Sequence, residues 1–515
     1  MVNHLYGYRL PGRWAVQSLR VVAGLDLFAL AAFGLPLLLY TLTLAPTIYN
    51  LDSAELTTAV ATNGIVRATG YPLYLVLGKI WSWLPIGDMG YRMNLFSAVC
   101  GAATILLLDR ILRRLKVNPW LRLAALGLLA TAPYFWALSL IAEVYTLHTV
   151  LMAGIILLLL RWADDPTSGR LAAPIFLSVL SMGNHSATVL LLPGLVFYVL
   201  ASHPKELLKR RVWFVGLLAA IAGATIFLAL PLRYAAAPAF NYAGQFDASG
   251  TFVPMDLLSF EGFWWLVTGK SFARQMFGYR LHELLPQVQD FGLQLWNAFI
   301  AIGIGPGILG LLVLMRRDWR LGGMLLLMFL ANAIFYINYR VIDKATMFLP
   351  VYVIWAIWLG VGYQALIQWL TSTRPHPRLR SLLYGSLVIM VLLALTWNWS
   401  RVDLSDDWST RRQGEDILQQ VHPHALIFGW WDTAPGLQYL QLVEGQRPDV
   451  KVINRFLISS EAMNRLILSE LGQRPIYINN PSIELLRVAI VTPVGPLYHL
   501  APHEIVSGDG RKPLN

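Results

Sequence analysis

Charge and cysteine are scarce in this sequence. Charged residues make up 13% of the 515 positions, about half the share of a typical soluble domain, and Cys100 is the one cysteine. A single cysteine excludes a disulfide within the chain, and its apolar surroundings indicate a packing residue. Hydrophobic residues make up 56% of the sequence. This balance excludes an ordinary soluble protein and favours a membrane protein.

Several catalytic signatures are absent as well. The sequence contains no phosphate-binding loop, no His-Glu-x-x-His pair and no nucleophile elbow. It also lacks a dinucleotide-binding glycine fingerprint between a strand and a helix. Soluble hydrolase or dehydrogenase chemistry therefore has no support. We predict no fixed metal site, although a divalent cofactor is compatible with the residues and not required by them.

Long apolar runs are present throughout the first 400 residues, and many approach the roughly 20 residues that cross a bilayer core. They predict an α-helical polytopic membrane protein with about eleven spans. A shorter apolar segment, 72–86, contains Lys79, Trp81 and Trp83, so we expect an interfacial or re-entrant helix there. The spans are placed near 22–44, 93–112, 119–140, 144–162, 171–184, 186–202, 212–232, 292–315, 322–339, 346–370 and 381–399.

Positive charge follows these spans in a regular way. With eleven spans, most basic loop residues fall on one side, which the positive-inside rule makes cytoplasmic. The net charge of +11 is then a topology signal, and no nucleic-acid partner is needed. The apolar run after the basic N-terminus is too long for a cleaved signal, so we expect a retained anchor in the plasma or inner membrane with a cytoplasmic N-terminus. The basic residues concerned are Arg9, Arg13, Arg20, Arg110, Arg113, Arg114, Lys116, Arg161, Arg170, Lys205, Lys209, Arg210, Arg211, Arg316, Arg317, Arg320, Arg374, Arg378 and Arg380.

The same threading places two long loops, 45–92 and 233–291, on the extracytoplasmic side. Within the second, the Pro- and Gly-containing stretch 235–256 is predicted to be a loop. We expect residues 1–400 to form the membrane module and 401–515 a small extracytoplasmic α/β domain. In this tail, short β-like runs (425–429, 450–453, 476–478, 488–491) alternate with helical stretches (412–421, 435–444, 459–471).

Asp52 and Glu55 stand three residues apart in the first of these loops. On a helix this spacing puts both carboxylates on one face, where they could act as a general base or hold a metal. The alternative is structural: Asp52 caps a short helix and Glu55 closes a capping box. Spacing alone does not decide between the two.

Further polar motifs fall on the same face. Glu143 and His148 lie at or just within membrane depth, where ionisable groups are costly and are usually functional, although a structural salt bridge is an alternative. Arg67, before the turn Gly70-Tyr71-Pro72, could face a phosphate. His185, in a predicted turn with Asn184, is on its own more typical of a hydrogen-bonded turn residue than of a ligand.

Three cations occur where the topology rule makes them rare: Arg233, Arg340 and Lys344. They could bind an anionic group such as a lipid phosphate. They could equally pair with Asp343, Glu143 or Asp52.

Taken in order, these motifs resemble those of the GT-C superfamily of membrane glycosyltransferases, in its protein O-mannosyltransferase-like branch, formerly a domain of unknown function. The similarity spans nearly the whole chain. The family usually has His-Pro-Pro where this chain has Arg67-Ala68-Thr69, which puts its donor handling in question. The matching pieces are Pro46-Thr47 to Glu55, Gly70-Tyr71-Pro72-Leu73-Tyr74, Arg92-Met93-Asn94-Leu95-Phe96-Ser97, Ala142-Glu143-Val144-Tyr145, Gly183-Asn184-His185, Pro231-Leu232-Arg233, Asn338-Tyr339 with Asp343, Leu349-Pro350 and Arg447-Pro448-Asp449-Val450.

The resemblance implies inverting transfer of one sugar, with mannose as a candidate, from a polyprenyl-phosphate carrier to an acceptor hydroxyl of a protein, lipid or glycan. It makes Asp52 the general base. Glu55 and Glu143 would orient Asp52 or bind sugar hydroxyls. The candidate groups for the donor phosphate are Arg67, His185, Arg233, Arg340 and Lys344, and the candidate sugar, acceptor or supporting residues are Tyr71, Glu143, Tyr145, His148, Asn184 and Asp343.

Two other functions are compatible with these residues. A transporter or lipid flippase would also carry charges in the membrane, but the sequence shows no internal repeat. A non-catalytic, lipid-phosphate-binding relative would fit the departure at Arg67. In the tail, Trp430-Trp431-Asp432 follows a predicted strand, where α/β sheets tend to bind ligands, and could contact the acceptor. Simple packing over the outer loops is the alternative for these residues.

Overall fold

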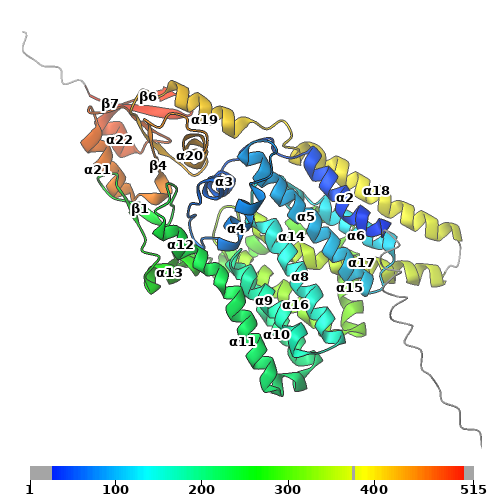
Figure 1. The fold of residues 1–515 in the computed structure, drawn as a ribbon. Coiled ribbons are helices and arrows are strands. Elements are labelled where there is room, and N and C mark those ends of the chain that lie inside the picture. The colour runs from blue at the N-terminus through cyan, green and yellow to red at the C-terminus, as the bar shows by residue number, and fades with distance from the viewer. Residues whose placement is uncertain (1–25, 374–376, 504–515) are drawn as a thin grey trace, which may run out of the picture.

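The computed structural model describes residues 26–373 and 377–503, and Figure 1 shows a bundle of helices with a small sheet at one end. We call the end of the bundle that faces this sheet the site end. Several predicted features lie outside the described residues: Arg9, Arg13, Arg20 and Arg374, the first part of the span near 22–44, and the last residues of the tail, 504–515.

Every predicted span corresponds to one or more helices. Six helical segments in the described part of the chain are long and apolar enough to cross a membrane by themselves, so the chain is a multi-pass membrane protein. The bundle helices are α2 (Leu27–Leu42), α5 (Met89–Arg114), α6 (Pro119–Ala130), α7 (Pro133–Ala137), α8 (Val144–Asp164), α9 (Ser168–Met182), α10 (Leu192–Ser202), α11 (Arg210–Ala224), α12 (Ala229–Ala235), α14 (Leu284–Ala298), α15 (Ile304–Arg317), α16 (Trp319–Ile337), α17 (Leu349–Thr373) and α18 (Pro377–Val402), with short 3₁₀ turns η1 (Ser186–Leu191), η3 (Thr225–Leu228) and η6 (Lys344–Phe348) beside them.

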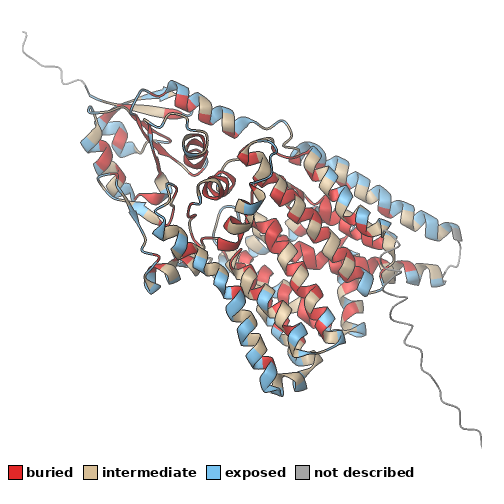
Figure 2. Ribbon diagram, viewed as in Figure 1, coloured by how far each residue is buried: buried red, intermediate tan, exposed pale blue. Residues whose placement is uncertain are grey.

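Burial orders these helices from the centre of the bundle to its edge (Figure 2). In the apolar stretch of α17 83% of residues are buried, and in that of α8 78% are, whereas for α11 and α18 the share is 11%. Helices that are apolar on all sides pack at the centre or face hydrocarbon. We therefore place α8 and α17 at the core and α11 and α18 against lipid.

The prediction of one helix over 292–315 is wrong. The chain breaks between α14 and α15, and Ile300 and Ala301 adopt positive φ in the break. Beyond it, α15 packs backbone to backbone on α17: a Cβ built on Gly310 would lie 1.7 Å from the carbonyl oxygen of Trp358. Small residues permit such close approach in membrane helices. This contact fixes the direction of α15 independently of α14.

The tail forms the predicted α/β arrangement. Its five-stranded sheet has the order β4-β3-β5-β7-β6, in which β4, β3 and β5 are parallel and β7 and β6 run antiparallel at one edge. Every residue of β3 is buried, as expected for a central parallel strand. The sequence pattern did not predict β7 or α22. The elements are α19 (Ser409–Gln420), β3 (Leu426–Gly429), α20 (Ala434–Leu442), β4 (Lys451–Asn454), α21 (Ser460–Glu470), β5 (Ile476–Ile478), α22 (Ile483–Val488), β6 (Ala489–Val494) and β7 (Leu497–Pro502).

The two long loops contain secondary structure. The first holds α3 (Asp52–Thr62) and α4 (Pro72–Trp81), and α4 agrees with the short helix predicted over 72–86. The second holds the hairpin β1 (Gly244–Phe246) and β2 (Phe252–Pro254), followed by α13 (Phe260–Val267). The prediction that 235–256 is only a loop is therefore wrong. The runs that form β1 and β2 are three residues each, too short to show a strand period in the sequence.

Polar contacts join the sheet to the site end of the bundle. Arg411 on α19 forms ion pairs with Glu444 at 2.6 Å and with Asp88, just before α5, at 3.3 Å. Lys451 on β4 donates to the carbonyl oxygen of Gly250 in the hairpin turn at 2.6 Å. In Figure 1, α3 lies between α20 and the bundle, which places the first loop against the sheet.

Candidate functional site

Asp52 is the first residue of α3, and the capping-box interpretation of the Asp52–Glu55 pair is wrong. The N-cap residue is Leu51, at φ 56°, and no side chain caps the helix. Positive φ is uncommon for a bulky residue and is found at turns and functional sites. Both carboxylates are therefore free to bond groups outside their own helix.

Two donors hold the Asp52 carboxylate. Arg67 Nη2 lies 2.5 Å from Oδ2, and the indole N–H of Trp431 lies 2.9 Å from Oδ1. Trp431 comes from the C-terminal domain and is 7% exposed. The sheet therefore contributes directly to the surroundings of Asp52, since Trp431 follows β3 at the carboxyl edge of a parallel strand.

Arg67 connects both acids with the aromatic groups around them. Its guanidinium lies 4.2 Å from the ring centroid of Trp431 and 6.0 Å from that of Phe272. Its backbone N–H donates to Glu55 Oε1 at 2.8 Å, and its Nε lies 4.0 Å from Glu55 Oε2. A position between two carboxylates and over an aromatic ring suits arginine better than lysine. Arg67 thus fixes the relative positions of α3 and the Gly70-Tyr71-Pro72 turn.

Glu55 is only 2% exposed. Burial raises the pKa of its carboxyl to about 8, with Arg67 opposing the shift and Asp52 adding to it. Desolvation disfavours the charged form of a carboxyl group, so Glu55 is largely protonated near neutral pH. Asp52 and Arg67 then form the charged pair, with Glu55 as a neutral neighbour.

A cavity of about 300 Å³ opens beside Asp52 and Arg67. Its wall contains Tyr71, Tyr145, His185 and Asp343 of the predicted site, together with side chains of η1, α16 and η6. The ring of His185 lies 6.0 Å from that of Tyr71 and 5.6 Å from that of Tyr145. Burial raises the pKa of the Asp343 carboxyl, and Asp52 raises it further. We call this space the helix-side cavity.

Three of the predicted supporting residues lie behind the wall. Glu143 is the N-cap residue of α8, and the ring of His148 lies 5.6 Å from that of His185. Asn184 donates to the carbonyl oxygen of Val144 at 3.0 Å. Glu143 Oε2 and His148 Nε2 are buried without a protein partner. Buried polar atoms without a partner are uncommon and indicate strain, a bound water or a functional role.

The remaining predicted cations have other contacts. Arg233 donates to the carbonyl oxygens of Gly64 and Leu75 at 2.9 and 3.3 Å. Arg340 forms an ion pair with Glu283 at 3.5 Å, and Lys344 donates to Gln287. None of the three lines the helix-side cavity, so their predicted role in binding phosphate stays a prediction.

The aromatic residues of the second long loop that lie around Arg67 were not predicted from the sequence. Phe272 and Tyr242 lie near Arg67 and Trp431, and the rings of Tyr242 and Trp431 are 5.4 Å apart. These residues stand in no recognisable motif. The ordered match over the first loop and the Trp430-Trp431-Asp432 motif pointed to this region, whereas the second loop reaches it through tertiary contacts.

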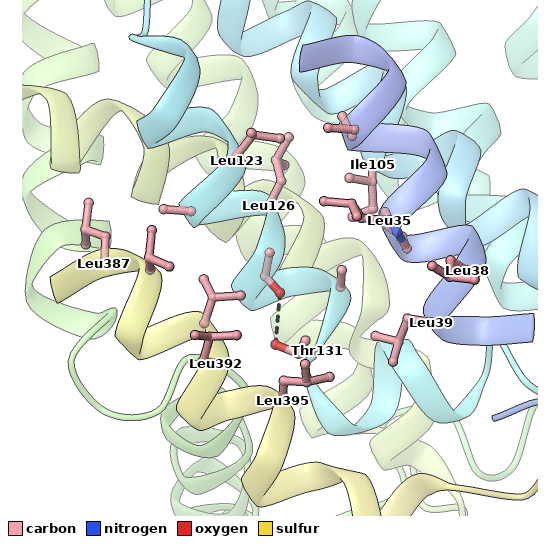
Figure 3. A pocket seen from close by; sticks show the side chains of 18 of the residues that line it. Leu35, Leu38, Leu39, Ile105, Leu123, Leu126, Thr131, Leu387, Leu392 and Leu395 are labelled. Atoms are coloured by element: carbon pink, nitrogen blue, oxygen red, sulfur yellow. Dashed lines mark hydrogen bonds between the residues drawn. The ribbon is translucent and has the colours of Figure 1, made fainter. Parts of the chain in front are cut away.

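A separate groove among α2, α5, α6 and α18 has a different character (Figure 3). Its volume is about 500 Å³, and no charged side chain lines it. Leu35, Leu126 and Leu392 contribute to its wall, and the Thr131 hydroxyl is bonded to Gly127. Such a surface suits hydrocarbon and offers nothing to orient a sugar or phosphate. This groove is therefore not a candidate for the sugar-transfer site, whereas the helix-side cavity contains charged side chains.

The whole fold is similar to that of a GT-C glycosyltransferase. A crystal structure of ArnT from Cupriavidus metallidurans bound to undecaprenyl phosphate matches with a TM-score of 0.57 and 13% identity, covering 94% of this chain and 100% of that one. The apo form of the same protein matches with a TM-score of 0.56 and 12% identity, covering 94% and 98%. The chain therefore has the GT-C membrane fold, as predicted.

The sequence is similar to that of one group of glycosyltransferases, the protein O-mannosyl-transferases. Residues 52–208 match the family model described as the protein O-mannosyl-transferase TMEM260 N-terminal domain. The chain is 24% identical over 461 residues to protein O-mannosyl-transferase TMEM260 of Mus musculus, and 21% identical over 497 residues to that of Dictyostelium discoideum. These matches cover 84% and 86% of this chain but 63% and 59% of the relatives, so the chain spans about three fifths of their length. The resemblance to the protein O-mannosyltransferase-like branch of the GT-C superfamily is confirmed.

Proposed function

We propose that this chain is an integral-membrane glycosyltransferase that moves one sugar from a polyprenyl-phosphate donor to an acceptor hydroxyl on the extracytoplasmic face. One observation carries the proposal: Asp52 and Arg67 form a charged pair at the wall of a cavity between membrane helices. The names of the relatives favour mannose as the sugar and a protein as the acceptor. The undecaprenyl phosphate bound by ArnT, which has the same fold, supports a polyprenyl carrier.

The helix-side cavity suits the donor headgroup. Apolar residues from η1 and α16, among them Leu190 and Phe335, lie in the same wall as Asp52 and Arg67. A lipid-linked sugar needs this combination, because its tail stays among apolar side chains while its phosphate meets a cation. Arg67 is the cation in this wall. With Glu55 protonated, an incoming phosphate meets one fewer negative charge.

The proposed reaction is a single inverting displacement. The acceptor oxygen attacks the anomeric carbon, the bond from that carbon to the phosphate oxygen breaks, and Asp52 takes the hydroxyl proton. The products are the glycosylated acceptor and the polyprenyl phosphate, whose added negative charge is stabilised by Arg67. Each Asp52 oxygen accepts one hydrogen bond and keeps a lone pair for the acceptor hydroxyl. A shift of Arg67 from Asp52 Oδ2 towards the donor phosphate would make that oxygen a stronger base.

Asp52→Asn tests the base assignment. The asparagine keeps the size of the side chain and an oxygen for Trp431 but cannot accept the proton, so transfer should fall about 100-fold or more. Turnover would be measured with polyprenyl-phosphate mannose, and donor binding by mass spectrometry of lipid that copurifies with the protein. Binding should persist in the variant.

Asp318→Asn is the matched control. Asp318 caps α16 through the backbone N–H of Leu321 at 3.1 Å, at the end of α16 remote from Tyr339, and asparagine caps a helix equally well. This variant should transfer sugar at the wild-type rate. Turnover of Asp52→Asn within a few-fold of the control would contradict the role of Asp52 as base.

A further inference from the structure

A second cavity adjoins the helix-side cavity at Arg67. Its volume is about 710 Å³, and it lies between the hairpin β1–β2, α13 and the C-terminal domain. Arg67, Ala68 and Phe272 line both cavities. Trp431, which donates to Asp52, lines the second one. We call this space the sheet-side cavity.

The two cavities differ in the elements that wall them. The helix-side cavity is bounded by η1, α16 and η6, next to the membrane helices. The sheet-side cavity has no wall from these elements and is bounded by the second long loop and the sheet. A lipid-anchored donor can reach the first from the bilayer, and an acceptor from the aqueous phase can reach the second. The charged pair of Asp52 and Arg67 stands where they meet.

The charge of the sheet-side wall does not favour an anionic ligand. Its charged side chains are Arg67, which is paired with Asp52, and Asp247. The Asp247 carboxylate already accepts hydrogen bonds from Ser249 and Thr251 within its own turn. A phosphorylated lipid or an acidic glycan at this wall would have to share Arg67 with the donor phosphate, because the described residues that line the wall include no second cation.

Aromatic and amide side chains make up much of the uncharged wall of the sheet-side cavity. Trp265 on α13 faces the same space as Phe456, which follows β4, and Gln245 and Gln275 supply neutral donors and acceptors. Val253 and Phe456 are 55% and 61% exposed. Exposed apolar side chains gathered at one cavity of an aqueous domain indicate a binding surface. The ligand is therefore neutral and partly apolar.

The hairpin adds a backbone feature. β2 pairs with β1 alone among the strands of the described residues, so its other edge has no strand partner, and Val253 and Pro254 of β2 line the cavity. Sheet edges bind extended peptides by adding a strand, while pockets for alternate side chains give specificity. We infer that the sheet-side cavity binds an extended polypeptide segment and presents its Ser or Thr hydroxyl to Asp52. This inference rests on the proposed glycosyl transfer.

Adjacent tryptophans on α13 allow a sharp test. Trp265 lines the cavity, whereas Trp264 is 54% exposed and stacks on Phe260 outside it. The photoreactive residue p-benzoylphenylalanine would be placed at position 265 or 264 of the full chain in detergent. The probe is a biotinylated, end-blocked mixture of seven-residue peptides with a central Thr. Capture at position 265 should exceed that at 264 at least fivefold and fall when unlabelled peptide is added.

A kinetic arm uses Trp265→Ala and Trp264→Ala with the same peptides and polyprenyl-phosphate mannose. Trp265→Ala should raise the KM for peptide at least tenfold and leave the KM for donor within twofold. Trp264→Ala should change neither. Equal capture at the two positions, or a rise in the donor KM with Trp265→Ala, would overturn the inference.

The outcomes separate this inference from the proposed function. Specific capture at position 265 without any sugar transfer would contradict the transferase function and leave the peptide site standing. Transfer to the peptides without capture at position 265 would support the function and refute the site.

Discussion

The Asp52 carboxylate is held by one donor 15 residues away in sequence and another 379 residues away. Charge-assisted hydrogen bonds of this kind fix the position of the carboxylate strongly. Arg67 stands where the family usually has histidine, and in this chain it pairs with the proposed base. In the proposed reaction, donor binding and activation of the base are linked at one residue, because the same guanidinium faces Asp52 and the helix-side cavity.

Glu55 gives a prediction at the scale of a single residue. Its pKa is raised from 4.5 to about 8 in the folded protein, so the folded state binds more protons than the unfolded state between these values. The contribution of Glu55 to stability is therefore complete below pH 4.5 and is lost as the pH rises towards 8. Glu55→Gln, which stays neutral, should gain stability over wild type as the pH increases.

Thermal unfolding in detergent at pH 5, 7 and 9 would measure this effect. The difference in Tm between Glu55→Gln and wild type should be smallest at pH 5 and largest at pH 9. Glu206→Gln is a control, since this carboxylate pairs with Lys209 in an exposed loop remote from the site. A difference for Glu55→Gln that does not change with pH would show that the buried carboxyl is not protonated.

At the scale of elements, periodicity and length predicted most helices. The break between α14 and α15 was not predicted because Ile300, Ala301 and Ile302 are all apolar, although Gly303, Gly305 and Pro306 directly after them favour a break. What separates the two helices is the contact of α15 with α17 through Gly307, Gly310 and Gly362. The spacing of glycines along α15 does not show which helix will pack against them.

The α15–α17 contact predicts that alanine substitution at two glycines of α15 will change the stability of the protein by very different amounts. A Cβ at Gly310 would meet the Trp358 carbonyl oxygen at 1.7 Å, whereas nothing lies within 4 Å of one at Gly305. Gly310→Ala should destabilise the protein by about 3 kcal/mol. Gly305→Ala should be neutral or slightly stabilising, because alanine favours helix.

Thermal unfolding of both variants in the same detergent measures the difference. A clear loss of Tm for Gly310→Ala beside an unchanged Gly305→Ala is the expected result. Equal Tm values for the two variants would mean that α15 can move away from α17 with little loss of stability.

At the scale of the whole molecule, the C-terminal sheet completes the site on the membrane module. Trp431 donates to Asp52 and supplies the aromatic face for Arg67. The preceding residue, Trp430, has other partners: Arg455 lies 4.3 Å from its ring centroid, and its backbone N–H donates to Asn479. The domain is thus joined to the proposed chemistry by one of two adjacent tryptophans.

Trp431→Phe removes the N–H and keeps the aromatic ring. If the sheet positions Asp52, kcat should fall about tenfold while the KM for donor stays near wild type. Trp430→Phe, the matched control, should leave kcat unchanged. A rise in KM with an unchanged kcat for Trp431→Phe would mean that this residue binds substrate without positioning the base.

The sequence by itself determined the membrane class, most helices, the α/β character of the tail and the candidate Asp52, because burial in lipid and in sheets leaves periodic apolar patterns and ordered motifs. The tertiary structure decided what Asp52 contacts. It rejected the cap, assigned Arg67 and Trp431 as partners, and left Arg233, Arg340 and Lys344 outside the cavity wall. It also formed the sheet-side cavity from β1–β2, α13 and the tail. The physical reason is that a pattern along the chain records what each residue must avoid, such as water or lipid, whereas a partner hundreds of residues away is set only when the chain packs.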